Sequence, residues 1–178
     1  MIEHTEILSG DSIRIERVLA APPQRIWDYI VDPEKRARWF CGGDAMRDTG
    51  QRFAFAFNHT RITPEPEPNA PPREPGAPDF VSYGEVLEFM PPRLLKFMWE
   101  QKANARSEVM FELTPEGDGT RVVITHTRLP SRGDVLSVGG GWNAHLDMLA
   151  DELAARTHGP FWSQYAAYKA TLEPKLPQ

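Results

Sequence analysis

Between residues 80 and 127 the chain alternates apolar and polar side chains, whereas beyond residue 134 its apolar residues fall at helical spacing. Four segments carry the alternation: 80–90, 94–100, 107–113 and 120–127. In the second of them Leu95, Phe97 and Trp99 share one face. A period of two predicts strands with one buried face. Because short connections join the segments, we expect an antiparallel sheet.

A long helix is expected after this sheet. Residues 134–156 carry four apolar side chains at spacings of 4, 3 and 4: Trp142, Leu146, Leu149 and Leu153. That spacing is one face of a helix, and only this helix is long enough to cover a sheet. We interpret the three glycines at 139–141 as a break or flexible start in the helix. A shorter, added helix is expected at about 160–173.

The first part of the chain predicts one strand and two short helices. The strand covers residues 12–19, and two prolines then open an amphipathic helix over 24–31. Asp32 is expected to cap a second short helix, with Pro33 in its first position. This helix should run towards Trp39 and end at the glycines that follow.

A further strand over 51–58 places Phe53, Phe55 and Phe57 on one face. The order is therefore a strand, two short helices, a long antiparallel sheet and a long helix. We expect a single domain over residues 1–178, of the α+β class.

Proline sets one exception to this regular pattern. The chain has 17 prolines, and seven of them lie in residues 64–78, PEPEPNAPPREPGAP. The stretch contains no aromatic and no β-branched residue, and proline disfavours helix and central strand. We expect an extended loop over 63–79 that the fold does not need. Alternatively, its Pro-Glu-Pro-Glu-Pro sequence is a ligand for a proline-recognising module.

Composition narrows the class of protein. The chain has 178 residues and a net charge of −5, which gives no electrostatic reason to bind nucleic acid. A single cysteine, Cys41, forbids an internal disulfide, and we expect its thiol to be inert. No apolar run fits a signal peptide or a membrane span, so we expect a cytoplasmic protein. We interpret the basic run Lys35, Arg36 and Arg38 as a solvated helix face.

Four segments in order carry a family resemblance: IRIERVLAAPPQRIWDYIVDPEKRARWF, GEVLEFMPPRLLKFMW, EGDGTRVVITHTRL and GGGWNAHLDMLADEL. Over about residues 11–155 they resemble the START-like or SRPBCC superfamily in its Aha-type branch. That branch is named after the C-terminal domain of the activator of the heat-shock-protein-90 ATPase. The resemblance implies a helix-grip fold, in which a curved sheet wraps a long helix and leaves a cavity between them.

The candidate binding residues are those expected to face that cavity. The apolar set comprises Phe53, Phe55, Phe57, Tyr83, Phe97, Trp99, Trp142, Leu146 and Leu149. Aromatic rings suit ligand pockets because they offer large apolar contact with little rotamer entropy to lose, although simple core packing is the competing interpretation. The polar candidates are Glu85, His126 and His145, with Glu88 replacing Glu85 if its strand faces the other way.

Three functions remain open from the sequence. The first is binding of a small hydrophobic or amphipathic molecule between sheet and helix. The second is a cyclase, hydrolase or isomerase that uses the cavity histidines and a glutamate for acid–base chemistry. The third is a protein-interaction module that acts through the proline-rich loop or as a homodimer through its last helices. No metal or cofactor is expected, because the chain has no His-Glu-x-x-His, cysteine pair or phosphate-loop motif.

Overall fold

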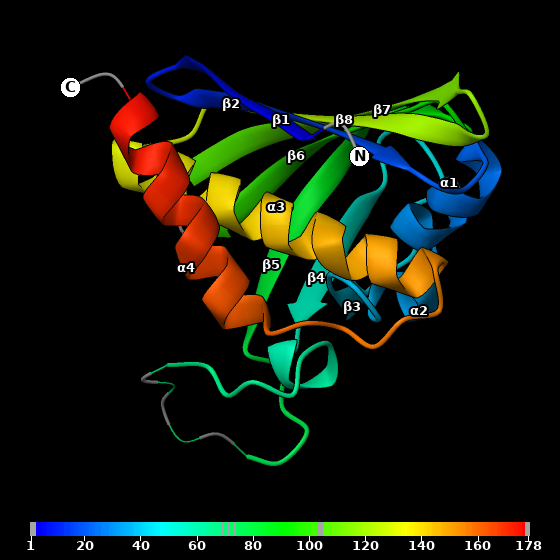
Figure 1. Ribbon diagram of the computed structural model, residues 1–178. Helices are drawn as coiled ribbons and strands as arrows, with labels where there is room; N and C mark the ends of the chain where they lie inside the picture. The colour runs from blue at the N-terminus through cyan, green and yellow to red at the C-terminus, as the bar shows by residue number, and fades with distance from the viewer. Residues whose placement is uncertain (1–2, 69, 71, 73, 103–104, 177–178) are drawn as a thin grey trace.

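The computed structural model describes residues 3–68, 70, 72, 74–102 and 105–176, and at its centre a curved sheet wraps a long helix (Figure 1). The sheet has eight strands in the order β1-β2-β8-β7-β6-β5-β4-β3, and all neighbours are antiparallel. The strands are β1 (Glu3–Ser9), β2 (Ser12–Leu19), β3 (Gly42–Gly43), β4 (Arg52–Phe57), β5 (Phe80–Met90), β6 (Leu94–Lys102), β7 (Ala105–Glu116) and β8 (Gly119–Thr127). The predicted α+β helix-grip fold is confirmed.

Helices cover the concave face of this sheet. They are α1 (Pro23–Val31), α2 (Pro33–Arg36), α3 (Arg132–Leu153) and α4 (Phe161–Leu172), with two single turns, η1 (His59–Arg61) and η2 (Glu173–Lys175). α3 crosses the sheet and α4 packs against α3 (Figure 1). The predicted cap of α2 is confirmed, because the Asp32 carboxylate accepts the backbone N–H groups of Glu34 and Lys35. None of the helices in the described ranges is long and apolar enough to cross a membrane.

The sequence pattern does not predict β1, which pairs with β2 at one edge of the sheet. Only Ile7 and Leu8 are apolar in this strand, so its alternation is weak. Ile7 packs against the core while Leu8 is exposed. Thr5 faces α3 and donates a hydrogen bond to Asn143. Tertiary pairing, rather than its own hydrophobic pattern, makes this segment a strand.

The predicted break at glycines 139–141 is wrong, because α3 is continuous through them. A Cβ atom on Gly139 would lie 2.7 Å from the Ile13 side chain, and one on Gly140 would lie 3.0 Å from the Tyr165 backbone oxygen. These distances are shorter than van der Waals contact. The glycines therefore allow α3 to approach β2 and α4 closely, at the cost of helix propensity.

Arg36 is buried, so the predicted solvated face does not include it. Its guanidinium donates hydrogen bonds to five backbone carbonyls: Ile30, Val31, Cys41, Gly42 and Asp44. These acceptors belong to the end of α1 and to the segment after α2, which stops at Arg36 rather than running to Trp39. Arg36 thus joins the two short helices to the sheet edge. Burial lowers the pKa of this guanidinium.

The glycines after α2 form β3 instead of ending the helix. Gly43 has a φ of +101°, and a Cβ there would lie 2.1 Å from the carbonyl oxygen of Ala54, so only glycine fits. Cys41 precedes this strand and is fully buried; burial raises the pKa of its thiol to about 12. That state agrees with an inert cysteine.

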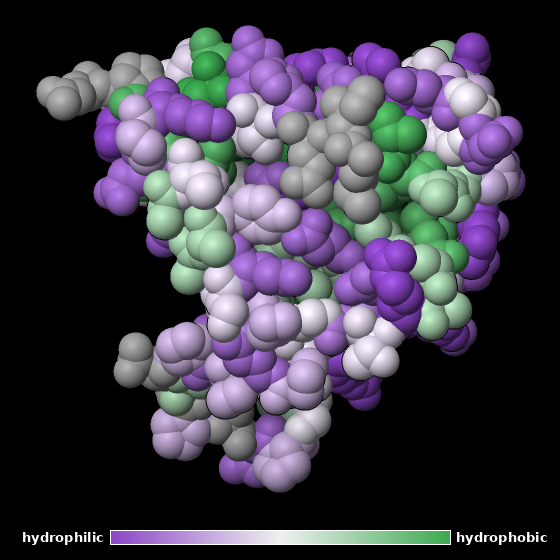
Figure 2. Space-filling model, in the orientation of Figure 1, coloured by the Kyte–Doolittle hydropathy of each residue, from purple (hydrophilic) through white to green (hydrophobic). Residues whose placement is uncertain are grey.

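The proline-rich loop projects from the body of the molecule (Figures 1 and 2). Its described residues form no helix or strand. The start of the loop is nevertheless fixed to α4, and its end is fixed by Asp79, which donates its backbone N–H to Phe57 and accepts that of His59. Thr63 is buried and its hydroxyl accepts the backbone N–H of Phe161, while Glu65 accepts the N–H of Ser163 in the first turn of α4. The loop is therefore dispensable at most in its middle.

Candidate functional site

A pocket of about 310 Å³ lies between the sheet, α3 and α4. Fourteen residues line it: Phe40, Phe57, His59, Phe80, Trp99, Asp134, Ser137, Val138, Gly141, Trp142, His145, Phe161, Trp162 and Tyr165. Phe80 is 46% exposed and stacks on Phe57 with ring centroids 4.3 Å apart. Phe40 stacks on Trp142 at 4.9 Å. The walls are therefore mostly aromatic, with a rim open to solvent.

Two histidines form a polar end within this pocket. The Nδ1 atom of His59 lies 2.7 Å from Oδ2 of Asp79, at the end of the proline-rich loop. The Nδ1 atom of His145 lies 2.7 Å from the backbone oxygen of Trp39. The two imidazole rings are 5.6 Å apart, and Phe161 from α4 contacts both.

The protonation of His145 follows from its surroundings. Burial, and then the charge of His59, hold the pKa of His145 well below its ordinary value of 6.5, although the bond to Trp39 opposes this shift. His145 is therefore neutral at pH 7. A carbonyl can only accept, so Nδ1 carries the proton and Nε2 is left as a hydrogen-bond acceptor.

His126 does not belong to the pocket, so its predicted ligand contact is not supported by its position. Its Nδ1 atom accepts the indole N–H of Trp142 at 3.1 Å, and its Nε2 atom lies 2.8 Å from the hydroxyl of Ser107. Both nitrogens are thus bonded inside the core. Burial alone lowers the pKa of His126 to about 3.

Tyr83 and Glu85 lie on the outer face of β5, which corrects their predicted placement in the cavity. Tyr83 is 54% exposed, whereas Ser82 and Gly84 face inwards. A β-bulge between Val86 and Glu88 shifts the alternation by one residue. Phe89 packs against the core as a result, while Glu85 and Glu88 both stay outside it.

The other predicted residues divide into two groups. Phe57, Trp99, Trp142 and His145 line the pocket. Phe53, Phe55, Phe97, Leu146 and Leu149 are buried in the core behind it. The aromatic stripe of β4 therefore serves mainly as packing, and only its last member reaches the pocket.

The sequence interpretation missed His59, Asp79 and the first turn of α4. One signal was present, because His59 continues the alternation of Phe55 and Phe57 by two residues. Nothing in the sequence brings Phe161 and Trp162 to this point, since about 100 residues separate them from η1. The indole Nε1 of Trp162 is buried and has no hydrogen-bond partner among the described residues.

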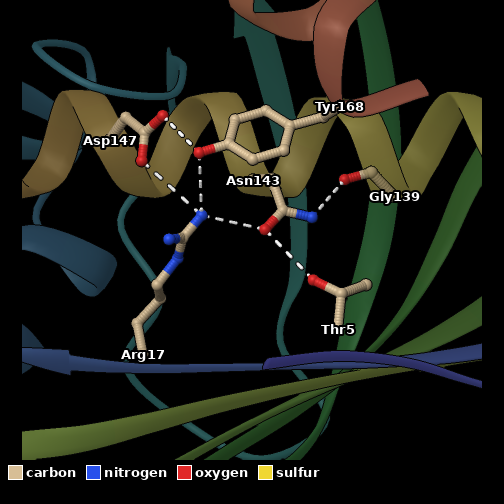
Figure 3. A network of polar contacts seen from close by, with 6 residues as sticks. All are labelled: Thr5, Arg17, Gly139, Asn143, Asp147 and Tyr168. Carbon is tan, nitrogen blue, oxygen red and sulfur yellow. Dashed lines mark hydrogen bonds and ion pairs between the residues drawn. The ribbon is translucent and has the colours of Figure 1, made fainter. Parts of the chain in front are cut away.

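A second buried polar cluster lies elsewhere along α3 and links four elements (Figure 3). The guanidinium of Arg17 on β2 donates hydrogen bonds to Asn143 at 2.9 Å and Tyr168 at 3.3 Å, and it lies 3.5 Å from Asp147. Asn143 also accepts from Thr5 of β1. None of these residues lines the aromatic pocket. The cluster therefore fixes β1, β2, α3 and α4 together.

A larger hollow of about 600 Å³ lies beside the end of α3 and the β7–β8 turn. Its lining includes Leu19, Gly117 and Ala154 but no aromatic ring and no histidine. Three charged residues, Glu116, Asp118 and Arg156, also line it, but Glu116 is paired with Arg121 and Arg156 with Asp151. No cluster of three His, Cys, Asp or Glu side chains suited to a metal occurs in the described ranges.

Comparisons with known proteins agree with this architecture. A protein from Bordetella parapertussis, solved by NMR, has 39% sequence identity and a TM-score of 0.76, covering 98% of this chain and 91% of its own. The crystal structure of CalU16 from Micromonospora echinospora has 26% identity and a TM-score of 0.62, covering 96% of this chain and 99% of its own. An HSP90 activator from Plasmodium falciparum has 16% identity and a TM-score of 0.58, covering 82% and 96%, and so shares the fold.

No curated protein matches the sequence. The family model described as "Activator of Hsp90 ATPase homolog 1-like protein" matches residues 20–154, which include both short helices, β3 to β8 and all of α3. The chain therefore belongs to this family, the Aha-type branch of the SRPBCC superfamily.

Proposed function

We propose that the protein binds a small, mainly apolar molecule in the aromatic pocket. The observation that carries this proposal is the pocket itself, an aromatic cavity of about 310 Å³ with two histidines at one end. This volume is near the lower limit for small-molecule sites, so the ligand should be small. Rigid rings supply apolar contact, and His59 or His145 would orient one polar group of the ligand.

Gly141 offers a way to test the pocket without disturbing the core. It lines the pocket from α3, and a Cβ atom there would have no heavy atom within 4 Å apart from its two chain neighbours and its own helix backbone. Its neighbours Gly139 and Gly140 are instead packed against other elements. A side chain at position 141 would therefore enter the pocket, and it would raise helix propensity by up to about 1 kcal/mol.

The experiment is a fluorescence titration with 1-aminoanthracene, a neutral apolar probe. We expect Gly141→Leu to weaken binding at least about tenfold, because leucine occupies space that the probe needs. Ala167→Leu is the matched control, since it adds the same side chain at an exposed position of α4. If folded Gly141→Leu binds the probe as tightly as the wild type, the proposal is wrong. Native mass spectrometry of the purified protein would add the mass of any retained ligand.

An enzyme is the second candidate, and one observation favours it. The predicted catalytic set of His126, His145 and Glu85 is not assembled, because His126 is bonded within the core and Glu85 lies on the outer face. The observation in favour is that His59, which lines the pocket, contacts the carboxylate of Asp79 through Nδ1. The interaction-module hypothesis stays a prediction, because the Plasmodium activator supports the fold alone.

A further inference from the structure

One wall of the pocket holds a carboxylate–imidazole pair that apolar binding does not require. Oδ2 of Asp79 lies 2.7 Å from Nδ1 of His59 and also accepts the backbone N–H of His59 at 2.9 Å. The side chains of His59 and Asp79 are only 9% and 5% exposed. A carboxylate that accepts a hydrogen bond from Nδ1–H fixes the tautomer of the ring and stabilises the imidazolium form.

His126 shows what a purely structural histidine looks like in the same chain. Both of its ring nitrogens contact protein groups, Trp142 and Ser107, and the ring lies behind the pocket wall. His59 differs because its ring lines the pocket, and its Nδ1 atom is the one directed to Asp79. The position of His59 thus allows exchange of a proton with a bound molecule.

His145 supplies a second, different group at the same end. Its ring is 5.6 Å from that of His59, and its Nδ1–H is held by the Trp39 carbonyl. Among the rings of the described residues that pack against His59, His145 on α3 can titrate, whereas Phe57, Phe161 and Trp162 cannot. The pocket therefore combines one carboxylate-backed imidazole with one neutral imidazole that accepts a hydrogen bond.

We propose that the Asp79–His59 pair is a general acid–base catalyst for a small, mainly apolar carbonyl compound with an acidic C–H bond. This inference rests on the proposed ligand binding. The Nε2 lone pair of His59 takes the proton, and the C–H electron pair moves into the substrate to form the enolate. Asp79 stays ionised beside the imidazolium. The imidazolium then returns the proton to another atom of the same molecule, so the product is an isomer and no further reactant is needed.

The test uses 5-nitrobenzisoxazole, a flat apolar probe whose C–H proton is removed as its N–O bond breaks, which gives a coloured phenolate. We expect the wild-type protein to exceed the rate of free imidazole at equal concentration. His59→Gln should lower that rate at least about 100-fold, in line with the usual contribution of a general base. His4→Gln is the control, because the His4 side chain is 60% exposed on β1.

Asp79→Asn provides the second variant, because an asparagine oxygen can still accept a hydrogen bond from Nδ1–H but carries no charge. We expect its rate to fall and the inflection of its rate–pH profile to move to lower pH, since the imidazolium loses its counter-ion. A merely structural Asp79 would leave the inflection unchanged, and that result would overturn the proposal. The proposal would also be overturned if the protein binds 1-aminoanthracene but converts 5-nitrobenzisoxazole no faster than free imidazole does. That result would leave the proposed ligand binding intact. Loss of binding to both probes would reject the two proposals together.

Discussion

Acid should destabilise the protein through His126, and the size of the effect can be worked from its environment. Burial lowers the pKa of His126 from 6.5 to about 3 in the folded protein. The unfolded chain therefore binds this proton below pH 6.5, whereas the folded protein does so only near pH 3. The free energy of unfolding is therefore unaffected by this group above pH 6.5, and it decreases as the pH drops from 6.5 towards 3. Linkage gives a loss of about 2 kcal/mol between pH 7 and pH 5.

The geometry explains why the folded state resists the proton. Nδ1 of His126 accepts a hydrogen bond from the indole N–H of Trp142. A proton on Nδ1 would therefore place two N–H donors opposite each other and remove this hydrogen bond. His145 adds to the acid sensitivity in the same direction, because burial and the charge of His59 also lower its pKa. Together the two histidines make the core less stable in mild acid.

The assay is urea unfolding at pH 7 and pH 5 for the wild type and His126→Asn. An asparagine oxygen can still accept from Trp142, but the side chain no longer titrates. Between pH 7 and pH 5, we expect the free energy of unfolding of the variant to fall by about 2 kcal/mol less than that of the wild type, whatever its absolute stability. His4→Asn, at an exposed position, should keep the wild-type difference.

Equal pH dependence in the wild type and His126→Asn would refute this reasoning. It would mean that His126 gains protons equally in the folded and unfolded states. NMR titration of the imidazole would measure the pKa of His126 directly. An inflection near 6.5 in the folded protein would show that burial does not hold this ring neutral.

Three further predictions concern the fold. Arg36→Met should lower the free energy of unfolding by about 3 kcal/mol or more, because it removes the donor of five carbonyl bonds, whereas Arg38→Met, 61% exposed, should change it by less than about 0.5 kcal/mol in the same urea assay. Replacing residues 67–76 by a Gly/Ser linker should change stability by less than about 1 kcal/mol, since loop-closure entropy varies slowly with length. Thr63→Val should cost about 1–3 kcal/mol, because it removes the acceptor for the N–H of Phe161; equal melting temperatures for Thr63→Val and the linker variant would contradict the anchoring of the loop.

Local sequence rules predicted the elements well because local chemistry decides them. Pro33 after Asp32 marks the start of α2, and the period-two runs mark β4 to β8. The same rules failed at the glycines of α3, where the packing of Ile13 and Tyr165 outweighs helix propensity. They failed again in β5, because a bulge reverses the facing of a strand without any clear mark in its composition.

The candidate site was harder to predict because it is built from contacts between distant parts of the chain. His59 alone suggests nothing more than the end of an aromatic strand. It becomes part of an acid–base pair only because the loop returns Asp79 to it, 20 residues later. The start of the loop is in turn held to α4, because the hydroxyl of Thr63 accepts the backbone N–H of Phe161, 98 residues further along. That contact places Phe161 against both histidines. The last residue of the proline-rich loop, Asp79, thus completes the proposed acid–base pair, and α4 adds Phe161, Trp162 and Tyr165 to the pocket wall.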